Sequence, residues 1–131
     1  MRFRRLTLGV LLAGACAAGG LAVASPAWAA DDAAPACRLV AEPPKQHGNR
    51  LEGKGKRDGC SDTVTYFWVR IYKVVDLFPD SEIAVKGRQY VRDDELAATG
   101  NCDGADTYYT HTSTATGLSG DSRESDRAQR C

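Results

Sequence analysis

The sequence predicts an all-β fold: a small disulfide-stapled β-sandwich or barrel of about seven short antiparallel strands. Segments rich in Val, Thr and aromatic residues recur between turn residues at a spacing of roughly 8–12 residues. No segment has the long apolar periodicity of an amphipathic helix, although residues 93–98 are compatible with a helical turn. Four cysteines follow an N-terminal export signal, which is typical of a disulfide framework: Cys37, Cys60, Cys102 and Cys131.

Residues 1–29 have the three parts of a signal peptide. A positively charged start with Arg2, Arg4 and Arg5 precedes an apolar stretch, and Ala27-Trp28-Ala29 forms an A-x-A cleavage site. The alternative is an uncleaved membrane anchor, since the apolar stretch approaches the roughly 20 residues that span a bilayer. Its Gly- and Ala-rich composition and the cleavage site favour removal. We therefore predict a secreted, extracellular protein that begins near residue 30, and the fifth cysteine, Cys16, leaves with the signal.

Removal of the signal changes the charge of the protein. The whole chain carries 17 Lys and Arg against 17 Asp and Glu, and the signal holds three arginines and no acids. The remaining domain of about 100 residues is therefore mildly acidic. A mildly acidic domain has no electrostatic basis for binding nucleic acid.

Four cysteines allow three pairings. We favour the sequential one, Cys37 with Cys60 and Cys102 with Cys131, because each pair then flanks its own turn-rich segment. Each bridge would close a loop of roughly 20–30 residues, which the chain-entropy estimate converts to about 3–4 kcal/mol of stabilisation.

The chain after the signal divides into an extended N-terminal arm, residues 30–49, and a β-sandwich domain, residues 50–131. The arm is poor in large apolar residues and is broken by prolines, so we expect it to be held only at Cys37. Glycines in the first strand indicate a bulge or a close approach of backbones, and Gly87-Arg88 reads as a turn. The expected strands are residues 50–58, 63–75, 83–85, 89–92, 95–99, 107–114 and a closing strand or tail at 122–131.

The strand at residues 63–75 has two different faces, because side chains alternate along a strand. Thr65, Phe67, Val69 and Ile71 form the apolar face that belongs in the core. The opposite face is an aromatic row interrupted by a guanidinium, a composition enriched at recognition surfaces. A central strand covered on both sides is the alternative. The candidate partner-binding residues on this row are Tyr66, Trp68, Arg70 and Tyr72. One of the adjacent tyrosines at 108 and 109 is expected to extend it.

Lys54, Lys56 and Arg57 form the one concentrated basic patch of the sequence and are further candidates for binding an acidic partner. A solvated strand guarded by lysines explains this patch equally well.

The sequence offers little for catalysis. Besides His47, His111 lies near several serines, and Gly120-Asp121-Ser122 is part of a serine-protease-like pattern, but there is no G-x-S-x-G and the domain is small for a triad. The turn aspartates Asp103 and Asp106 have no calcium-loop spacing. We predict no catalytic residues, no metal, no cofactor and no enzymatic activity.

Several segments together resemble small secreted proteins of Streptomyces and related actinobacteria, some of which are similar to the adaptor subunit of umbrella toxin particles. They are Gly53-Lys54-Gly55-Lys56-Arg57-Asp58-Gly59-Cys60, Phe67-Trp68-Val69-Arg70-Ile71, Tyr108-Tyr109-Thr110 and Ser122-Arg123 ahead of Cys131. In that family the adaptor is a small non-enzymatic domain. It bridges a lectin-bearing subunit, which has a degenerate trypsin-like domain, and a repeat scaffold that carries the toxin. The resemblance implies that the arm, with Pro43 and Pro44, inserts into a partner's cleft.

The residues and the resemblance lead to the same expectation, a secreted protein-interaction module that acts as an adaptor in an extracellular antibacterial complex. Its partners would be other secreted proteins, with no nucleic acid and, after cleavage, no membrane. The alternative is a secreted protease inhibitor that offers the arm or the Gly53–Cys60 segment as a substrate-like loop. A small hydrolase or calcium-binding enzyme would require a role for His111 or Asp121.

Overall fold

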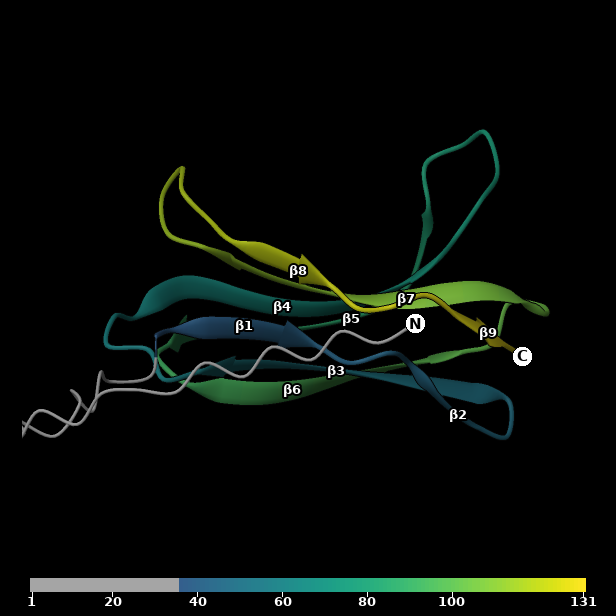
Figure 1. Cartoon of the computed structure of the whole chain (residues 1–131), viewed down its shortest axis with the longest axis horizontal. Coiled ribbons are helices and arrows are strands. Elements are labelled where there is room, and N and C mark those ends of the chain that lie inside the picture. The colour runs from purple at the N-terminus through teal and green to yellow at the C-terminus, as the bar shows by residue number, and fades with distance from the viewer. Residues whose placement is uncertain (1–35) are drawn as a thin grey trace, which may run out of the picture. The chain divides into compact units, whose positions relative to one another are not determined.

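The computed structural model describes residues 36–131, which form nine strands and two disulfides (Figure 1). The predicted signal peptide and residues 30–35 of the predicted arm lie outside the described residues. The strands are β1 (Arg38–Ala41), β2 (Lys45–His47), β3 (Arg50–Asp58), β4 (Val64–Lys73), β5 (Ser81–Val91), β6 (Asp94–Asn101), β7 (Asp106–Ala115), β8 (Ser122–Glu124) and β9 (Ala128–Arg130).

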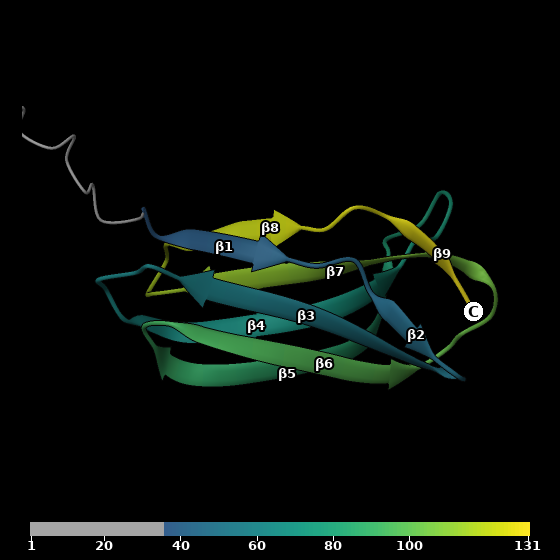
Figure 2. The ribbon, with the colours of Figure 1, turned by 60° about the horizontal axis from the view of Figure 1, so that its bottom comes forward.

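Two antiparallel sheets are stacked face to face, as Figures 1 and 2 show. In the first sheet, β3 pairs with β1 and β2 along one side and with β6 along the other. In the second sheet the order is β5, β4, β7, and then β8 and β9 pair in turn with β7. Because β1 with β2 and β8 with β9 are each one interrupted strand, the layers contain seven strand positions, and the predicted all-β sandwich is confirmed.

Alternation along β3 and β4 explains how the layers meet. Inward positions of β3 are Leu51, Gly53, Gly55 and Arg57, and outward positions are charged. An added Cβ at Gly53 would lie 2.8 Å from the Ile71 side chain, so this glycine permits the close approach of the two sheets. The expected irregularity in the long strand is present as a register shift against β5 at Ile71/Tyr72.

The core lies between the sheets and is built mainly from β4. Phe67, Val69 and Ile71 are fully buried, as predicted, while Val64 rather than Thr65 reaches the core at the start of the strand. The core is completed by residues from four other strands: Leu51, Val91, Leu96, Ala98 and Tyr108. The Tyr108 hydroxyl donates to Gly104 O at 2.7 Å, so its polar end is paired.

The sequential pairing of the cysteines is confirmed. Cys37–Cys60 joins the start of β1 to the loop after β3, and Cys102–Cys131 joins the end of β6 to the residue after β9. The second bridge therefore links the two sheets. No helix within residues 36–131 is long and apolar enough to cross a membrane.

Two local predictions are wrong. Residues 38–47 are not an arm held only at Cys37, because β1 and β2 pair along β3 and belong to the sandwich. Gly87-Arg88 is not a turn, since β5 continues through it, and Gly87 lies against the Cδ1–Nε1 edge of the Trp68 indole. The strand predicted at residues 95–99 is confirmed as part of β6, which begins at Asp94, so the alternative of a helical turn at residues 93–98 does not apply.

Candidate interaction face

The outer face of the β5–β4–β7 sheet carries the predicted aromatic row together with two residues of β7. We call this set the aromatic face: Tyr66, Trp68, Arg70, Tyr72, Tyr109 and His111. Cross-strand pairing brings the two strands into register, with Tyr72 opposite Tyr109 and Arg70 opposite His111. Of the two adjacent tyrosines, Tyr109 extends the row and Tyr108 points into the core.

Three side chains of β4 stack along the strand. The rings of Tyr66 and Trp68 are parallel, with centroids 5.0 Å apart, and the Arg70 guanidinium lies 5.0 Å from the Trp68 ring centroid. Both faces of the indole are therefore occupied, one by an aromatic ring and one by a cation. Arg70 is in turn held by Ser113, to whose Oγ it donates at 3.0 Å, and by Glu82 at 3.1 Å. The stack is a fixed surface with half-exposed edges rather than an open ring platform.

A second cluster surrounds Tyr109 at the other end of the face. Tyr72 stacks on it with centroids 5.5 Å apart, and the Arg127 guanidinium lies 5.4 Å from its centroid. The Tyr109 hydroxyl donates to Asp80 Oδ2 at 2.9 Å. Burial, and then this bond to a carboxylate, raises the pKa of Tyr109 above its ordinary range, because both favour the protonated hydroxyl that donates to Asp80.

His111 lies between these clusters, with its ring edge-on to Tyr72. Burial lowers the pKa of His111, and the neighbouring Glu124 carboxylate acts in the opposite direction. Its Nδ1 is buried without a hydrogen-bond partner, and no described serine or carboxylate orients the ring. The base of a catalytic triad needs such an orienting bond, so this arrangement is not a triad.

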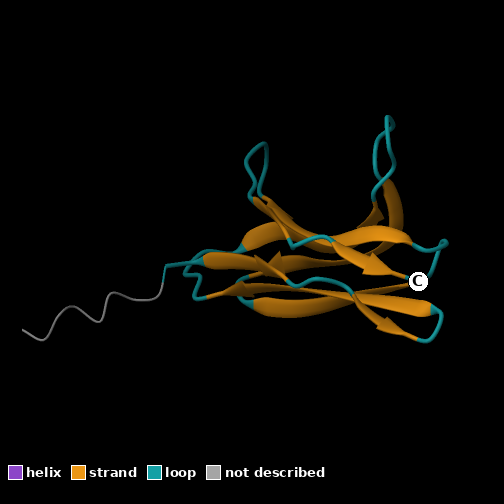
Figure 3. Ribbon diagram, turned by 45° about the vertical axis from the view of Figure 1, so that its right-hand side comes forward, coloured by secondary structure: helices purple, strands orange, loops and turns teal. Residues whose placement is uncertain are grey.

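Two loops rise from this sheet on the side away from the other sheet and flank the aromatic face, as Figures 1 and 3 show. The β4–β5 loop presents Leu77 and Phe78, whose exposed fractions are 100% and 73%, and the β7–β8 loop presents a fully exposed Leu118. Between them Val85 of β5 and Tyr66 of β4 are also exposed. Large apolar side chains thus gather on one side of the molecule, a pattern that marks interaction sites.

The opposite outer face, on the β1–β3–β6 sheet, is charged and largely self-neutralised. Lys54 lies 3.7 Å from Glu52, and Lys56 lies 3.1 Å from Asp58, which also pairs with Arg38 at 3.3 Å. Lys56, and then Arg38, hold the pKa of Asp58 below its ordinary value. The two lysines of the predicted basic patch are therefore half-exposed members of a mixed-charge face.

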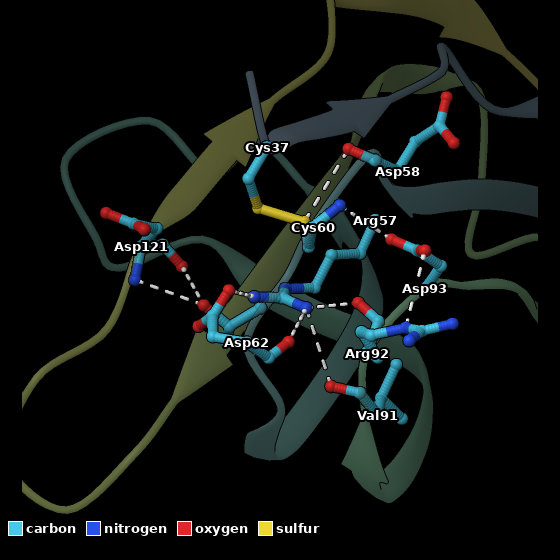
Figure 4. Close-up of a disulfide and its surroundings, with 10 residues drawn as sticks. Cys37, Arg57, Asp58, Cys60, Asp62, Val91, Arg92, Asp93 and Asp121 are labelled. Atoms are coloured by element: carbon cyan, nitrogen blue, oxygen red, sulfur yellow. Dashed lines mark hydrogen bonds and ion pairs between the residues drawn. A yellow bond between two sulfur atoms is a disulfide. The ribbon is translucent and has the colours of Figure 1, made fainter. Parts of the chain in front are cut away.

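Arg57 is not part of an exposed patch, which corrects its assignment as a binding residue. It points inward from β3 and is 4% exposed. Figure 4 shows its guanidinium beside the Cys37–Cys60 disulfide, where it donates to the carbonyls of Asp62, Val91 and Arg92 and pairs with the Asp62 carboxylate at 2.7 Å. Arg57 lowers the pKa of Asp62 through this contact. Its role is to tie two loops to the end of the sandwich.

The two prolines differ as well. Pro43 is exposed, but Pro44 is fully buried and its carbonyl accepts a hydrogen bond from Arg130 Nε at 2.8 Å. Proline cannot donate to a ladder, which explains why the edge strand is interrupted between β1 and β2. Pro44 is therefore structural in this fold.

The part of the chain that the structure describes holds one group with metal-ligand spacing, Cys37, Cys60 and Asp62, and its two cysteines form a disulfide. Asp103 and Asp106 both pair with Lys73, at 3.4 and 3.8 Å. A polar cavity of about 300 Å³ lies between β1 and β8 and is lined by residues that include Arg38, Arg123 and Asp121.

Fold and surface together define a class, a disulfide-stapled antiparallel β-sandwich with one aromatic outer face and one charged outer face. No protein-family model matches the chain. No curated protein matches it either. The aromatic row is predicted by the sequence, whereas Leu77, Phe78 and Leu118 are exposed residues that are not among the predicted binding residues. Their signal was available, since each lies among Pro, Gly or Asp turn residues where an apolar side chain has no core to enter.

Proposed function

We propose that this protein is a secreted, non-enzymatic interaction module that binds another extracellular protein through its aromatic face, as an adaptor in an antibacterial toxin complex. One observation carries the proposal. Tyr, Trp and Arg, the residue types that dominate binding hot spots, are stacked on one outer face between two loops with exposed apolar tips. The opposite face lacks this composition in the residues described.

Rigidity also supports a binding role. A side chain that is already fixed loses little conformational entropy when a partner covers it. Trp68 is fixed between Tyr66 and Arg70, and Arg70 is fixed by Ser113 and Glu82. The face therefore has the preorganisation that a protein interface exploits.

The test compares two single variants of the protein. Each variant is immobilised on a resin and incubated with culture fluid of the native source, and the retained partner is measured. Trp68→Ala removes the centre of the stack, and Lys54→Ala is the matched control on the opposite sheet. A hot-spot residue contributes at least about 2 kcal/mol, so we expect Trp68→Ala to weaken partner retention roughly 30-fold or more. Lys54→Ala should retain the partner. Equal retention by both variants, or migration of the protein from native fluid as a lone monomer, would refute the proposal.

The substrate-like segments first considered for a protease inhibitor do not favour that alternative. Residues 53–58 lie in the central strand β3, with neighbours on both sides, so this segment is not a free loop. Residues 38–47 are likewise paired in the sheet.

A further inference from the structure

The β4–β5 loop, residues 74–80, presents the most prominent apolar pair on the described surface. Leu77 and Phe78 are adjacent and exposed, and Pro79 follows them. Full exposure of two large apolar side chains at one point is unfavourable in water unless a partner covers them. The loop therefore requires an explanation beyond connecting two strands.

This loop is held in place by one carboxylate. Asp80 Oδ1 accepts a hydrogen bond from Val75 N at 3.1 Å across the base of the loop. Asp80 Oδ2 accepts the bond from the Tyr109 hydroxyl at 2.9 Å, which connects the loop to the aromatic face. Within the loop, Phe78 N donates to Val75 O at 3.4 Å. The loop and the aromatic face are thus one connected surface.

The backbone of the tip is not extended. Leu77 has φ 64°, in the left-handed region that non-glycine residues seldom adopt. Such residues cluster at ligand clamps and binding sites, where the surrounding structure maintains them. A peptide that adds to a sheet edge or lies along a cleft as a substrate needs extended backbone. The tip instead presents two side chains as a knob.

The charge of the tip selects among possible surfaces. Asp76 precedes Leu77, is exposed and forms no ion pair with the described residues, and residues 74–80 contain no Lys or Arg. The other loop repeats the pattern, with Leu118 followed by the exposed Asp121. An anionic membrane surface would repel both tips, whereas basic side chains around a pocket would attract them.

We propose that Leu77 and Phe78 form a preorganised apolar anchor that enters an apolar pocket, rimmed by basic side chains, on a folded extracellular protein. The inference rests on the proposed interaction function and names the element that enters the partner and the chemistry of the pocket. Asp80 is a positioning residue, which sets the loop conformation without meeting the partner.

Photocrosslinking identifies what the tip touches. A benzoylphenylalanine replaces Phe78 in the full secreted chain, and the control chain carries it at Thr99, an exposed position on the opposite sheet. The probe is concentrated culture fluid of the native source. We expect one protein to crosslink through position 78 and not through position 99, by a peptide that contains apolar residues and Lys or Arg. No crosslink at 78, or the same crosslinks at both positions, would overturn the proposal.

The crosslinked protein is then purified and its affinity measured against single variants. Burial of a Leu or Phe side chain corresponds to about a 10- to 150-fold change in Kd, so we expect losses of that size for Leu77→Ala and Phe78→Ala. Asp80→Ala should weaken binding and also accelerate hydrogen exchange at the Val75 amide, which donates to Asp80. The second effect would show that Asp80 influences binding by holding the loop in its conformation. Asp76→Lys should also weaken binding because its charge would oppose a basic rim.

Two outcomes separate this inference from the proposed function. If Trp68→Ala weakens binding and neither Leu77→Ala nor Phe78→Ala does, the interaction function stands and the anchor is wrong. If none of the three affects binding, both are wrong. Vesicles of phosphatidylcholine, with and without phosphatidylglycerol, form the last arm. If the wild type sediments with either vesicle and Phe78→Ala does not, the tip binds a membrane. That result would overturn the proposal that the tip enters a pocket on a protein partner.

Discussion

Three threonines on the inward side of β7 give a stability prediction that depends on buried hydroxyl groups. Thr110 and Thr112 are fully buried, and their Oγ1 atoms have no hydrogen-bond partner. They face Gly53 and Gly55 of the opposite sheet. Thr114, two residues further along the same face, is also buried but accepts a hydrogen bond from Asp121 N at 3.3 Å.

Valine has nearly the shape of threonine and replaces the hydroxyl by a methyl group. A buried hydroxyl without a partner costs about 1–3 kcal/mol, so Thr110→Val and Thr112→Val should each raise the free energy of unfolding by about 1–2 kcal/mol. In a domain of this size that corresponds to roughly 5–10 °C in Tm. Thr114→Val is the matched control. It removes a bond to a backbone amide beside an exposed residue and should lower stability by about 0.5–1 kcal/mol.

Urea unfolding followed by tryptophan fluorescence measures all three variants, with Tm by calorimetry as an independent check. The comparison is internal, because the substitution and the strand face are identical at the three positions. If Thr110→Val and Thr112→Val destabilise the protein as Thr114→Val does, then the two hydroxyls are paired in solution. Such a result would contradict the burial of unpaired Oγ1 atoms of Thr110 and Thr112 against Gly53 and Gly55.

Three further predictions follow from the corrected fold. An added Cβ at Gly87 would lie 2.5 Å from Trp68 Cδ1, so Gly87→Val should displace the indole ring. Trp68 is the one tryptophan of residues 36–131, and its fluorescence emission should shift to the red. An unchanged emission spectrum would contradict the contact between Gly87 and Trp68. Arg57→Met should lower the free energy of unfolding, measured by urea titration, by about 3 kcal/mol, because three carbonyl groups lose a charged donor. A loss below about 1 kcal/mol would show that water replaces the guanidinium as the donor. Burial lowers the pKa of His111 in the folded chain, so the unfolded chain binds a proton first as pH falls below about 6.5, and stability should decrease between pH 7.5 and 5.5. His111→Gln should reduce that decrease. A pH profile identical to that of the wild type would refute the role of His111 in the pH dependence of stability.

Much of the sandwich could be predicted because its signals are local. Alternation placed Phe67, Val69 and Ile71 in the core and Trp68 on the opposite side, and both follow directly from the geometry of a strand. The cysteine pairing was one of three possibilities, and the rule that each pair flanks its own turn-rich segment selected the pairing that the fold contains.

The errors share a physical cause, which is tertiary pairing that overrides local composition. Residues 38–47 look like an arm because they include two prolines, yet a proline at a sheet edge costs little, and β3 supplies backbone partners on either side of Pro43 and Pro44. Gly87 looks like a turn, but its missing side chain makes room for an indole from the next strand. β2 is joined to β3 by the two residues Gly48 and Asn49, but β1 pairs with the far end of β3, and Gly87 pairs with Trp68 across the β4–β5 connection. The contacts of β1 and of Gly87 are therefore not visible in local composition.

The two outer faces differ in how their charges are used, and this difference argues for a single direction of binding. On the charged face, the lysines of β3 pair with carboxylates of the same strand, so a partner would have to break those pairs and desolvate both members. On the aromatic face, the ion pair of Arg70 with Glu82 lies beside the stack and fixes it, and a partner can cover the ring edges without separating the charges. Covering the aromatic face therefore removes apolar area from water at little electrostatic cost. A partner that meets this molecule from the side of Leu77, Phe78 and Leu118 gains most, and the stable sandwich beneath keeps those side chains in place.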